Sequence, residues 1–154
     1  MKKVNIAFHI GSMIPGGTEK YVIRILSSLP HNKFKTHVII DEKKGILLQD
    51  LINEVDDVIE IIHKPGLINR IFWLYNTYSY LKTNRIDILQ AHNDISIFFL
   101  SIAGTLSRVK TMIYSQRHPG HLQSTKAIYS HGFWPARLKK MLTALVSRYW
   151  VDVI

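Results

Sequence analysis

Short apolar runs alternate along this chain with longer stretches in which apolar residues recur every three or four positions. The first run, residues 3–10, is brief and mostly apolar, which is typical of a buried strand. Four apolar residues then have the i, i+3, i+4, i+7 spacing of one helix face: Val22, Ile25, Leu26 and Leu29. Thr18 is the expected N-cap of this helix, and Pro30 is expected to end it. The chain therefore begins with a predicted strand followed by an amphipathic helix.

The same alternation continues to the end of the sequence. Further strands are predicted at residues 36–41, 57–63, 86–91, 111–115 and 151–154, and further helices at 46–54, 67–83, 95–107 and 136–150. The helix at 95–107 is apolar nearly all round and is expected to be buried, and a polar segment at 119–134 precedes the last helix. Strict alternation of strands and helices is typical of a parallel sheet with helices on both faces. We therefore expect one doubly wound, Rossmann-like α/β domain over residues 1–154.

A glycine-containing turn separates the first predicted strand from its helix. It includes Gly11, Gly16 and Gly17, and glycine allows a ligand to approach the bare backbone. The helix N-terminus that follows offers free N–H groups and the positive end of the helix dipole, which together suit an anion. The alternative is an ordinary strand–helix turn whose glycines only relieve steric crowding. The turn by itself does not separate these two interpretations.

Ligands of doubly wound sheets bind beyond the carboxyl ends of the strands, so the residues just after each strand are candidates. Besides the glycine turn, these are residues 41–42, 64–66, 92–94 and 116–120. They include two histidines, His92 and His118, and the guanidinium of Arg117. Titratable side chains beside an anion-binding turn favour a functional site. A single strand-end histidine, by contrast, more often has a structural role.

Composition narrows the choice of partner. The formal net charge of +9 favours an anionic partner such as phospholipid head groups or phosphorylated small molecules. The basic residues form no nucleic-acid-binding motif, so no nucleic-acid partner is expected. The sequence has no cysteine, which excludes disulfides and thiolate chemistry, and its eight histidines lack metal-ligand spacing. We therefore expect no metal site.

The apolar segments of the chain indicate where in the cell the protein is expected to be. The first residues lack the uninterrupted apolar region of a signal peptide, and residues 95–107 are too short to span a bilayer. We therefore expect a cytoplasmic protein, either free or peripheral on the inner face of the plasma membrane. The basic helix at 136–150 either rests on such a surface or simply packs on its own sheet.

Three segments carry motifs whose order and spacing match one known family. Gly16-Gly17-Thr18-Glu19 looks like a GGxE loop, and residues 87–93 read D-I-L-Q-A-H-N, similar to a fourth strand that ends in A-H-N. Residues 109–118 resemble a fifth strand that runs into a polar triplet, here Ser115-Gln116-Arg117. Together they resemble the N-terminal domain of the family-4 retaining glycosyltransferases of the GT-B fold.

The resemblance implies the acceptor-side half of an enzyme with two Rossmann-like domains. Such an enzyme transfers a sugar from a nucleoside-diphosphate sugar to a hydroxyl acceptor with retention of configuration. The acceptor is expected to be a cell-surface polysaccharide or a lipid-linked glycan. The segments expected to contact the membrane surface are the helix at 67–83, with its aromatic residues, and residues 119–150, with Trp134 and its lysines. Residues 1–154 contain no second Rossmann unit, so we expect the C-terminal donor-binding domain to be absent and the chain to be inactive alone. The resemblance implies neither a metal nor another cofactor.

It also implies roles for individual residues. Gly16 and Gly17 match the loop whose amides approach the donor diphosphate. The residues that match the acceptor side are Glu19, His92 and Asn93. Many family members place a histidine at the end of the fifth strand, whereas here Arg117 occupies that position and His118 follows. Both are candidate catalytic residues, and the planar guanidinium of Arg117 is suited to stabilise developing phosphate charge.

Two other classes of function remain open. A dehydrogenase nucleotide-binding domain requires G-x-G-x-x-G after the first strand, but the glycines here stand at 11, 16 and 17, although Asp41 has the place of a ribose-binding acid. A non-catalytic α/β module would bind an anionic partner or a second subunit through its basic surface. Binding of NAD rather than UDP would indicate the first alternative. Tight binding to a partner without nucleotide affinity would indicate the second.

Overall fold

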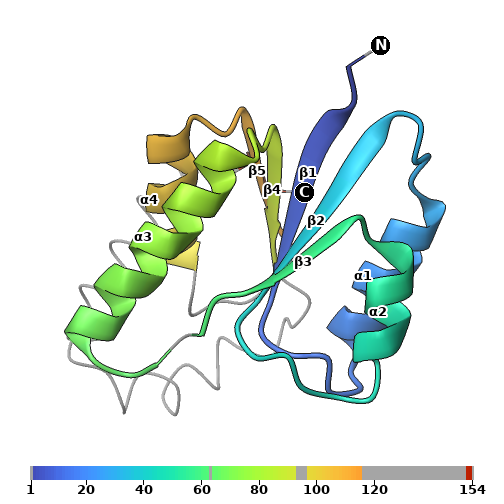
Figure 1. The fold of residues 1–154 in the computed structure, drawn as a ribbon, viewed down its shortest axis with the longest axis horizontal. Helices are drawn as coiled ribbons and strands as arrows, with labels where there is room; N and C mark the ends of the chain where they lie inside the picture. The colour runs from blue at the N-terminus through green and yellow to red at the C-terminus, as the bar shows by residue number, and fades with distance from the viewer. Residues whose placement is uncertain (1, 63, 93–96, 116–151, 154) are drawn as a thin grey trace.

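The computed structural model describes residues 2–62, 64–92, 97–115 and 152–153 (Figure 1). Within these residues six parallel strands form one sheet in the order β3-β2-β1-β4-β5-β6. The strands are β1 (Val4–Ile10), β2 (Phe34–Ile40), β3 (Asp57–Glu60), β4 (Ile88–Ala91), β5 (Thr111–Tyr114) and β6 (Asp152–Val153). The helices are α1 (Gly17–Ser28), α2 (Leu48–Glu54), α3 (Leu67–Thr83) and α4 (Ile97–Ser107). The predicted Rossmann-like α/β fold is confirmed.

Helices cover both faces of the sheet. α1 and α2 lie together on one face, and α3 packs against α4 on the other (Figure 1). The chain moves outward from β1 through β2 to β3, and then returns to add β4 on the other side of β1. The strand order therefore reverses between β1 and β4, and ligands of such sheets bind outside the carboxyl ends of the strands at this point. These carboxyl ends, with the loop that joins β1 to α1, lie toward the bottom of Figure 1.

One hydrophobic core lies on each side of the sheet, and β1 contributes to both because its successive side chains point to opposite faces. Phe8 is fully buried in the cluster that contains Val22 of α1. Ala7 belongs to the other cluster, with Trp73 of α3 and Leu100 of α4. A strand covered on both faces is apolar almost throughout, which explains why residues 3–10 form a continuous run rather than an alternating pattern.

Some predicted boundaries differ from the structure. The prediction that Thr18 caps the first helix is wrong: Gly16, in an extended conformation, is the N-cap, and the helix already begins at Gly17. β2 begins earlier than predicted because its first residue, Phe34, pairs in register with Val4 of β1. α2 begins later than predicted because the preceding segment is held by hydrogen bonds to Met13.

β3 and α4 also differ from expectation. β3 ends at Glu60, where its pairing with β2 ends, and the side chain of Ile62 beyond it is exposed. Most described side chains of α4 are buried or half-buried as predicted, but Leu106 in its last turn is 61% exposed. The polar segment at 119–134 and the basic helix at 136–150 lie outside the described residues. No helix in the described part combines the length and apolarity needed to cross a bilayer.

Candidate functional site

The loop between β1 and α1 places a helix N-terminus at the carboxyl edge of the sheet. Gly16 caps α1 with φ −154° and ψ 177°, and the helix begins at Gly17. Nothing lies within 4 Å of the position that a Cβ on Gly17 would occupy. Among the described residues, the amides of Gly16, Gly17 and Thr18 donate no backbone hydrogen bond. These amides, together with the helix dipole, are therefore able to receive an anion.

A second loop holds the first one in place. The amide of Met13 donates to the carbonyl of Lys44 at 2.7 Å, and the amide of Leu47 donates to the carbonyl of Met13 at 3.3 Å. Gly45, at φ +114°, lies so close that a Cβ there would fall 2.1 Å from the Met13 carbonyl. Gly45 was not among the predicted site residues. Its only signal was an isolated glycine within a polar segment between a predicted strand and a predicted helix.

The carboxylate of Glu19 folds back toward the start of its own helix. A Cβ on Gly16 would lie 2.3 Å from Oε2 of Glu19, so any other residue there would require this flexible side chain to move away. A carboxylate in the first turn is stabilised by the helix dipole. Because it also repels a second anion, a phosphate group is expected to approach the loop from the open side of Gly17.

A buried histidine and a strand-end carboxylate form a hydrogen-bonded group that the sequence analysis did not predict. His9 Nε2 lies 3.0 Å from Oδ1 of Asp41, and Trp73 Nε1 donates to the same oxygen at 3.1 Å. The rings of His9 and Trp73 meet edge to face, with their centroids 5.5 Å apart. The His9 side chain is fully buried, whereas 18% of the Asp41 side chain is exposed. The arrangement fixes a carboxylate at the carboxyl end of β2, beside the β1–α1 loop.

His92 follows β4 and lies at the same edge of the sheet. Its ring stacks against Phe8 with a centroid separation of 6.3 Å and meets the edge of Tyr21 at 5.8 Å. Because Tyr21 belongs to α1, these contacts bring His92 against the helix that follows the glycine turn. Of the predicted site residues, the structure thus brings Gly16, Gly17, Glu19 and His92 to one region. Asn93, Arg117 and His118 lie outside the described residues.

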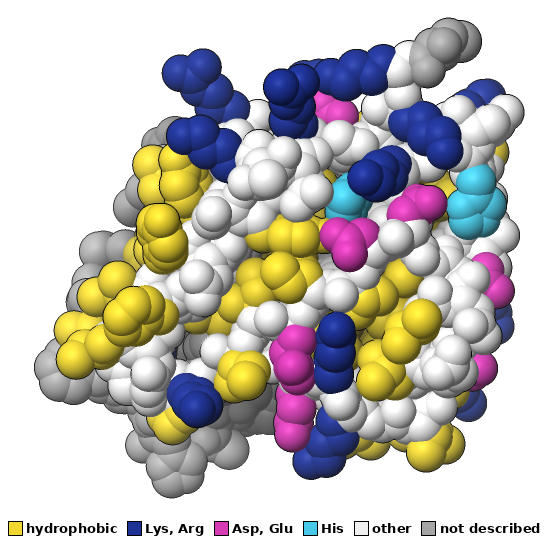
Figure 2. Space-filling view, viewed as in Figure 1, with side chains coloured by type: hydrophobic (Ala, Val, Ile, Leu, Met, Phe, Trp, Pro, Cys, Tyr) yellow, Lys and Arg dark blue, Asp and Glu magenta, His cyan; other side chains and the backbone are white. Residues whose placement is uncertain are grey.

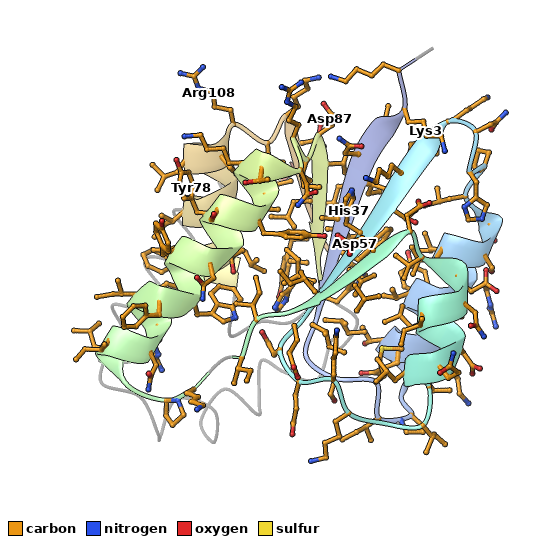
Figure 3. The ribbon with its side chains drawn as sticks, viewed as in Figure 1. Lys3, His37, Asp57, Tyr78, Asp87 and Arg108 are labelled. Carbon is orange, nitrogen blue, oxygen red and sulfur yellow. The ribbon has the colours of Figure 1, made fainter. Side chains whose placement is uncertain are left out.

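Two other polar groups stand away from this edge. His37 in β2 has Nδ1 2.9 Å from the Tyr80 hydroxyl, which in turn donates to Asp57 (Figure 3). Burial, with a contribution from the charge of Lys35, lowers the pKa of His37, so its buried ring is neutral at neutral pH. Burial, together with the hydrogen bond to Asp57, raises the pKa of Tyr80. His37 and Asp57 are paired residues in the middle of β2 and at the start of β3, remote from the carboxyl ends.

Asp87 opens the segment that resembles the family's fourth strand, and its role here is structural. It accepts a hydrogen bond from Lys110 Nζ at 2.7 Å and another from the Asn5 amide at 3.1 Å. The Lys110 ammonium lowers the pKa of Asp87, with help from the Asn5 amide. Asp87 therefore joins the amino ends of β1, β4 and β5, opposite the candidate site (Figure 3). Among the described residues, no group of three or more His, Asp or Glu side chains is arranged to hold a metal.

The strand order and the helix layers define a Rossmann-like domain of the kind found in GT-B enzymes. The structure is similar to Anabaena HepE, solved in complex with UDP and glucose, with a TM-score of 0.65 and 15% identity over 97% of this chain and 37% of that chain. It is similar to the lipopolysaccharide outer core galactosyltransferase WaaB, with a TM-score of 0.55 and 19% identity over 73% of this chain and 33% of that chain. A UDP-N-acetylglucosamine 2-epimerase matches with a TM-score of 0.54 and 15% identity over 94% of this chain and 40% of that chain.

These similarities establish the fold. The chain spans 33% to 40% of the length of these structures, so it corresponds to part of each of them. No protein-family model and no curated protein matches the sequence.

Proposed function

We propose that this chain is the N-terminal, acceptor-side domain of a glycosyltransferase that transfers a sugar from a nucleoside-diphosphate sugar with retention of configuration. One observation carries the proposal: the open amides of Gly16 and Gly17 lie at the same edge of the sheet as His92 and the fixed carboxylate of Asp41. It is supported by the fold, because HepE was solved with UDP and WaaB is a galactosyltransferase.

The proposed chemistry depends on stabilising the leaving diphosphate. The amides of Gly16 and Gly17 hydrogen-bond its oxygens, and the dipole of α1 contributes to the same stabilisation. The acceptor hydroxyl lies toward three residues: Glu19, His92 and Asn93. Arg117 and His118, which follow the fifth strand along the chain, would contribute cationic and titratable groups. No metal takes part in the proposed reaction, because hydrogen bonds from the amides and the charge of the guanidinium stabilise the leaving group.

In the proposed enzyme, two domains bind different parts of the substrates. A C-terminal domain binds most of the nucleotide-sugar and closes over the edge described here, while residues 1–154 bind the acceptor and contact the diphosphate. The chain alone is therefore expected to give no measurable transfer. Turnover of a nucleoside-diphosphate sugar by the purified chain would contradict this division.

The proposed acceptor is a cell-surface polysaccharide or a lipid-linked glycan at the inner face of the plasma membrane. A net charge of +9 suits the anionic surface at which such acceptors are found. The protein would work there as a peripheral domain.

A Gly17→Asp variant separates nucleotide binding from folding. The space around Gly17 is open, and a carboxylate in the first turn of α1 favours the helix by about 0.3–1 kcal/mol, so the fold should be retained. The same charge repels a diphosphate. We expect UDP binding, measured by equilibrium dialysis at millimolar nucleotide, to fall by about fivefold or more.

Ser28→Asp is the matched control, because it adds the same charge at the exposed far end of α1. It should leave UDP binding unchanged, and NAD should bind more weakly than UDP. The proposal is rejected if Gly17→Asp binds UDP as well as the wild-type chain does, if NAD binds more tightly, or if the wild-type chain binds no UDP.

A further inference from the structure

The outward face of α3 carries a cluster of exposed large apolar side chains. Five residues, here called the α3 stripe, are each 56–70% exposed: Leu67, Ile68, Ile71, Phe72 and Tyr75. Their spacing along the helix places them on one face over its first two turns and a half. Figure 2 shows apolar side chains gathered over α3 at the left of the molecule. Single exposed apolar residues are normal on a protein surface, but a contiguous group marks an interaction site.

The stripe is exposed although its helix is firmly packed. On the inward face of α3, Trp73, Thr77 and Leu81 are almost completely buried. Trp73 also donates a hydrogen bond to Asp41 at the end of β2. Rotation of α3 to cover the stripe would expose these three side chains and break that bond. The apolar surface is therefore a fixed feature of the domain.

The helical layer that carries the stripe contains cations and no acidic residue. Residues 64–86 and 97–110 include no Asp or Glu. Their six cationic residues are Lys64, Arg70, Lys82, Arg85, Arg108 and Lys110. The opposite layer differs, because α1 and α2 include Glu19, Asp50 and Glu54. Lys64 and Arg70 stand next to the stripe along the chain. The other four cations lie at or beyond the C-terminal ends of α3 and α4, and one of them, Lys110, is paired with Asp87. This layer is thus net positive, and its cations are here called the cationic border; part of it is seen at the upper left of Figure 2.

The same row of α3 changes from apolar to aromatic to cationic along the helix. Ile71, Tyr75, Tyr78 and Lys82 follow one another at helical spacing. Lys82 Nζ donates to the Tyr78 hydroxyl at 2.8 Å and lies 5.3 Å from the centre of its ring. This order is typical of a helix lying in a membrane interface. Its apolar side chains enter the acyl region, its tyrosines lie at the level of the head groups, and its lysines reach the phosphates.

We propose that the α3 stripe docks on the surface of an anionic lipid bilayer, with α3 lying in the plane of the interface. The cationic border complements anionic head groups. A second copy of the chain docked on the same face would place the cations of both copies against each other, which opposes association. The charge pattern therefore favours the bilayer as the occupant of this surface.

Docking on this face brings the bilayer beside the candidate site. The first turns of α3 lie at the carboxyl edge of the sheet, and Trp73 links the helix directly to Asp41. An acceptor carried in the membrane would thus reach the edge that holds the β1–α1 loop. This consequence for the acceptor rests on the proposed function, whereas the docking itself does not.

Co-sedimentation of the chain with vesicles tests the proposal. The vesicles contain phosphatidylcholine alone or with about one-third phosphatidylglycerol. We expect binding that increases with the anionic lipid. Phe72→Ser should lower the partition coefficient about tenfold, because it removes a large apolar side chain from the bilayer. Ile46→Ser is the matched control, since Ile46 is 80% exposed and precedes α2 on the other layer.

A second pair of variants tests the charge. Lys82→Glu should lower binding to anionic vesicles about tenfold, whereas Arg24→Glu, an exposed reversal on α1, should change it far less. The proposal is overturned if the wild-type chain does not bind vesicles, if binding ignores the anionic lipid, or if Phe72→Ser binds as well as Ile46→Ser. A dimer that Phe72→Ser dissociates, detected by light scattering, would assign the face to a second copy and also overturn it.

These assays contain no nucleotide or sugar, and the UDP measurement contains no lipid. Failure of vesicle binding alone therefore contradicts the docking proposal, and failure of UDP binding alone contradicts the proposed function.

Discussion

The imidazole Nε2 of His9 lies 3.0 Å from Oδ1 of Asp41, so a side-chain contact joins β1 to the end of β2 at the edge that holds the candidate site. The same carboxylate oxygen accepts the indole N–H of Trp73 from α3. A single oxygen therefore connects two strands and one helix. The backbone supports this contact, because the amide of Asp41 donates to the carbonyl of Ile10 at 3.1 Å.

Asp41→Ala is expected to destabilise the domain by about 2–4 kcal/mol. The substitution removes the shared acceptor and leaves buried polar atoms of His9 and Trp73 without this partner, a loss that costs roughly 1–3 kcal/mol for each group. Urea unfolding measures the change. Glu42→Ala is the control, since Glu42 is the next residue, its side chain is 62% exposed, and its carboxylate lies 3.7 Å from Lys44 Nζ at the surface. Equal effects of the two substitutions would show that the Asp41 group is not a structural anchor.

Gly45→Ala is expected to displace the loop that supports the glycine turn. Its φ of +114° is strained for any residue with a Cβ, and that Cβ would fall on the backbone of Met13. We expect a loss of about 2 kcal/mol or more in unfolding free energy. Gly17→Ala tests the specificity of this effect, because its Cβ would meet open space at a helical position. It should be neutral or slightly stabilising. A wild-type stability for Gly45→Ala would contradict the tight loop contact.

Stability is expected to fall as the pH drops below about 6.5, through His37. Burial lowers the pKa of His37 in the folded chain below its ordinary value of 6.5. The unfolded chain therefore binds more protons over this window, and acid favours unfolding. His37→Gln should reduce the loss of unfolding free energy between about pH 7.5 and pH 5, whereas His31→Gln, at an exposed position, should not. An unchanged pH dependence in His37→Gln would assign the effect to other groups.

The fold was predictable because the signals for it are local. Strand and helix periods identified each described element, and α3 was predicted with its observed bounds, Leu67–Thr83. The location of His92 beside the glycine turn followed from the rule that strand ends of a parallel sheet share one edge. Boundaries set by pairing or by loop contacts, such as the early start of β2, depend on partners that the local pattern does not contain.

The parts of the site that escaped prediction depend on contacts between distant segments. No role was predicted for His9, and its partner Asp41 lies 32 residues away. Gly45 supports the glycine turn through a loop from the next strand–helix unit. The aromatic residues of α3 made this helix a candidate for membrane contact, but its exposed face could not be predicted because aromatic and apolar residues surround the helix on most sides. Its sequence alone therefore does not show that Trp73 points inward and Phe72 outward.

The central claim is that the amides at the start of α1 receive a diphosphate, and a titration of the ¹⁵N-labelled chain with UDP, followed by NMR, tests it most directly. The account predicts that the largest amide shifts occur at Gly16, Gly17 and Thr18, that the His92 amide shifts less, and that His37 in the middle of the sheet does not respond. It also predicts that Gly17→Asp strongly reduces these shifts at the same UDP concentration. Shifts confined to other parts of the chain, or an unchanged response in Gly17→Asp, would contradict the claim.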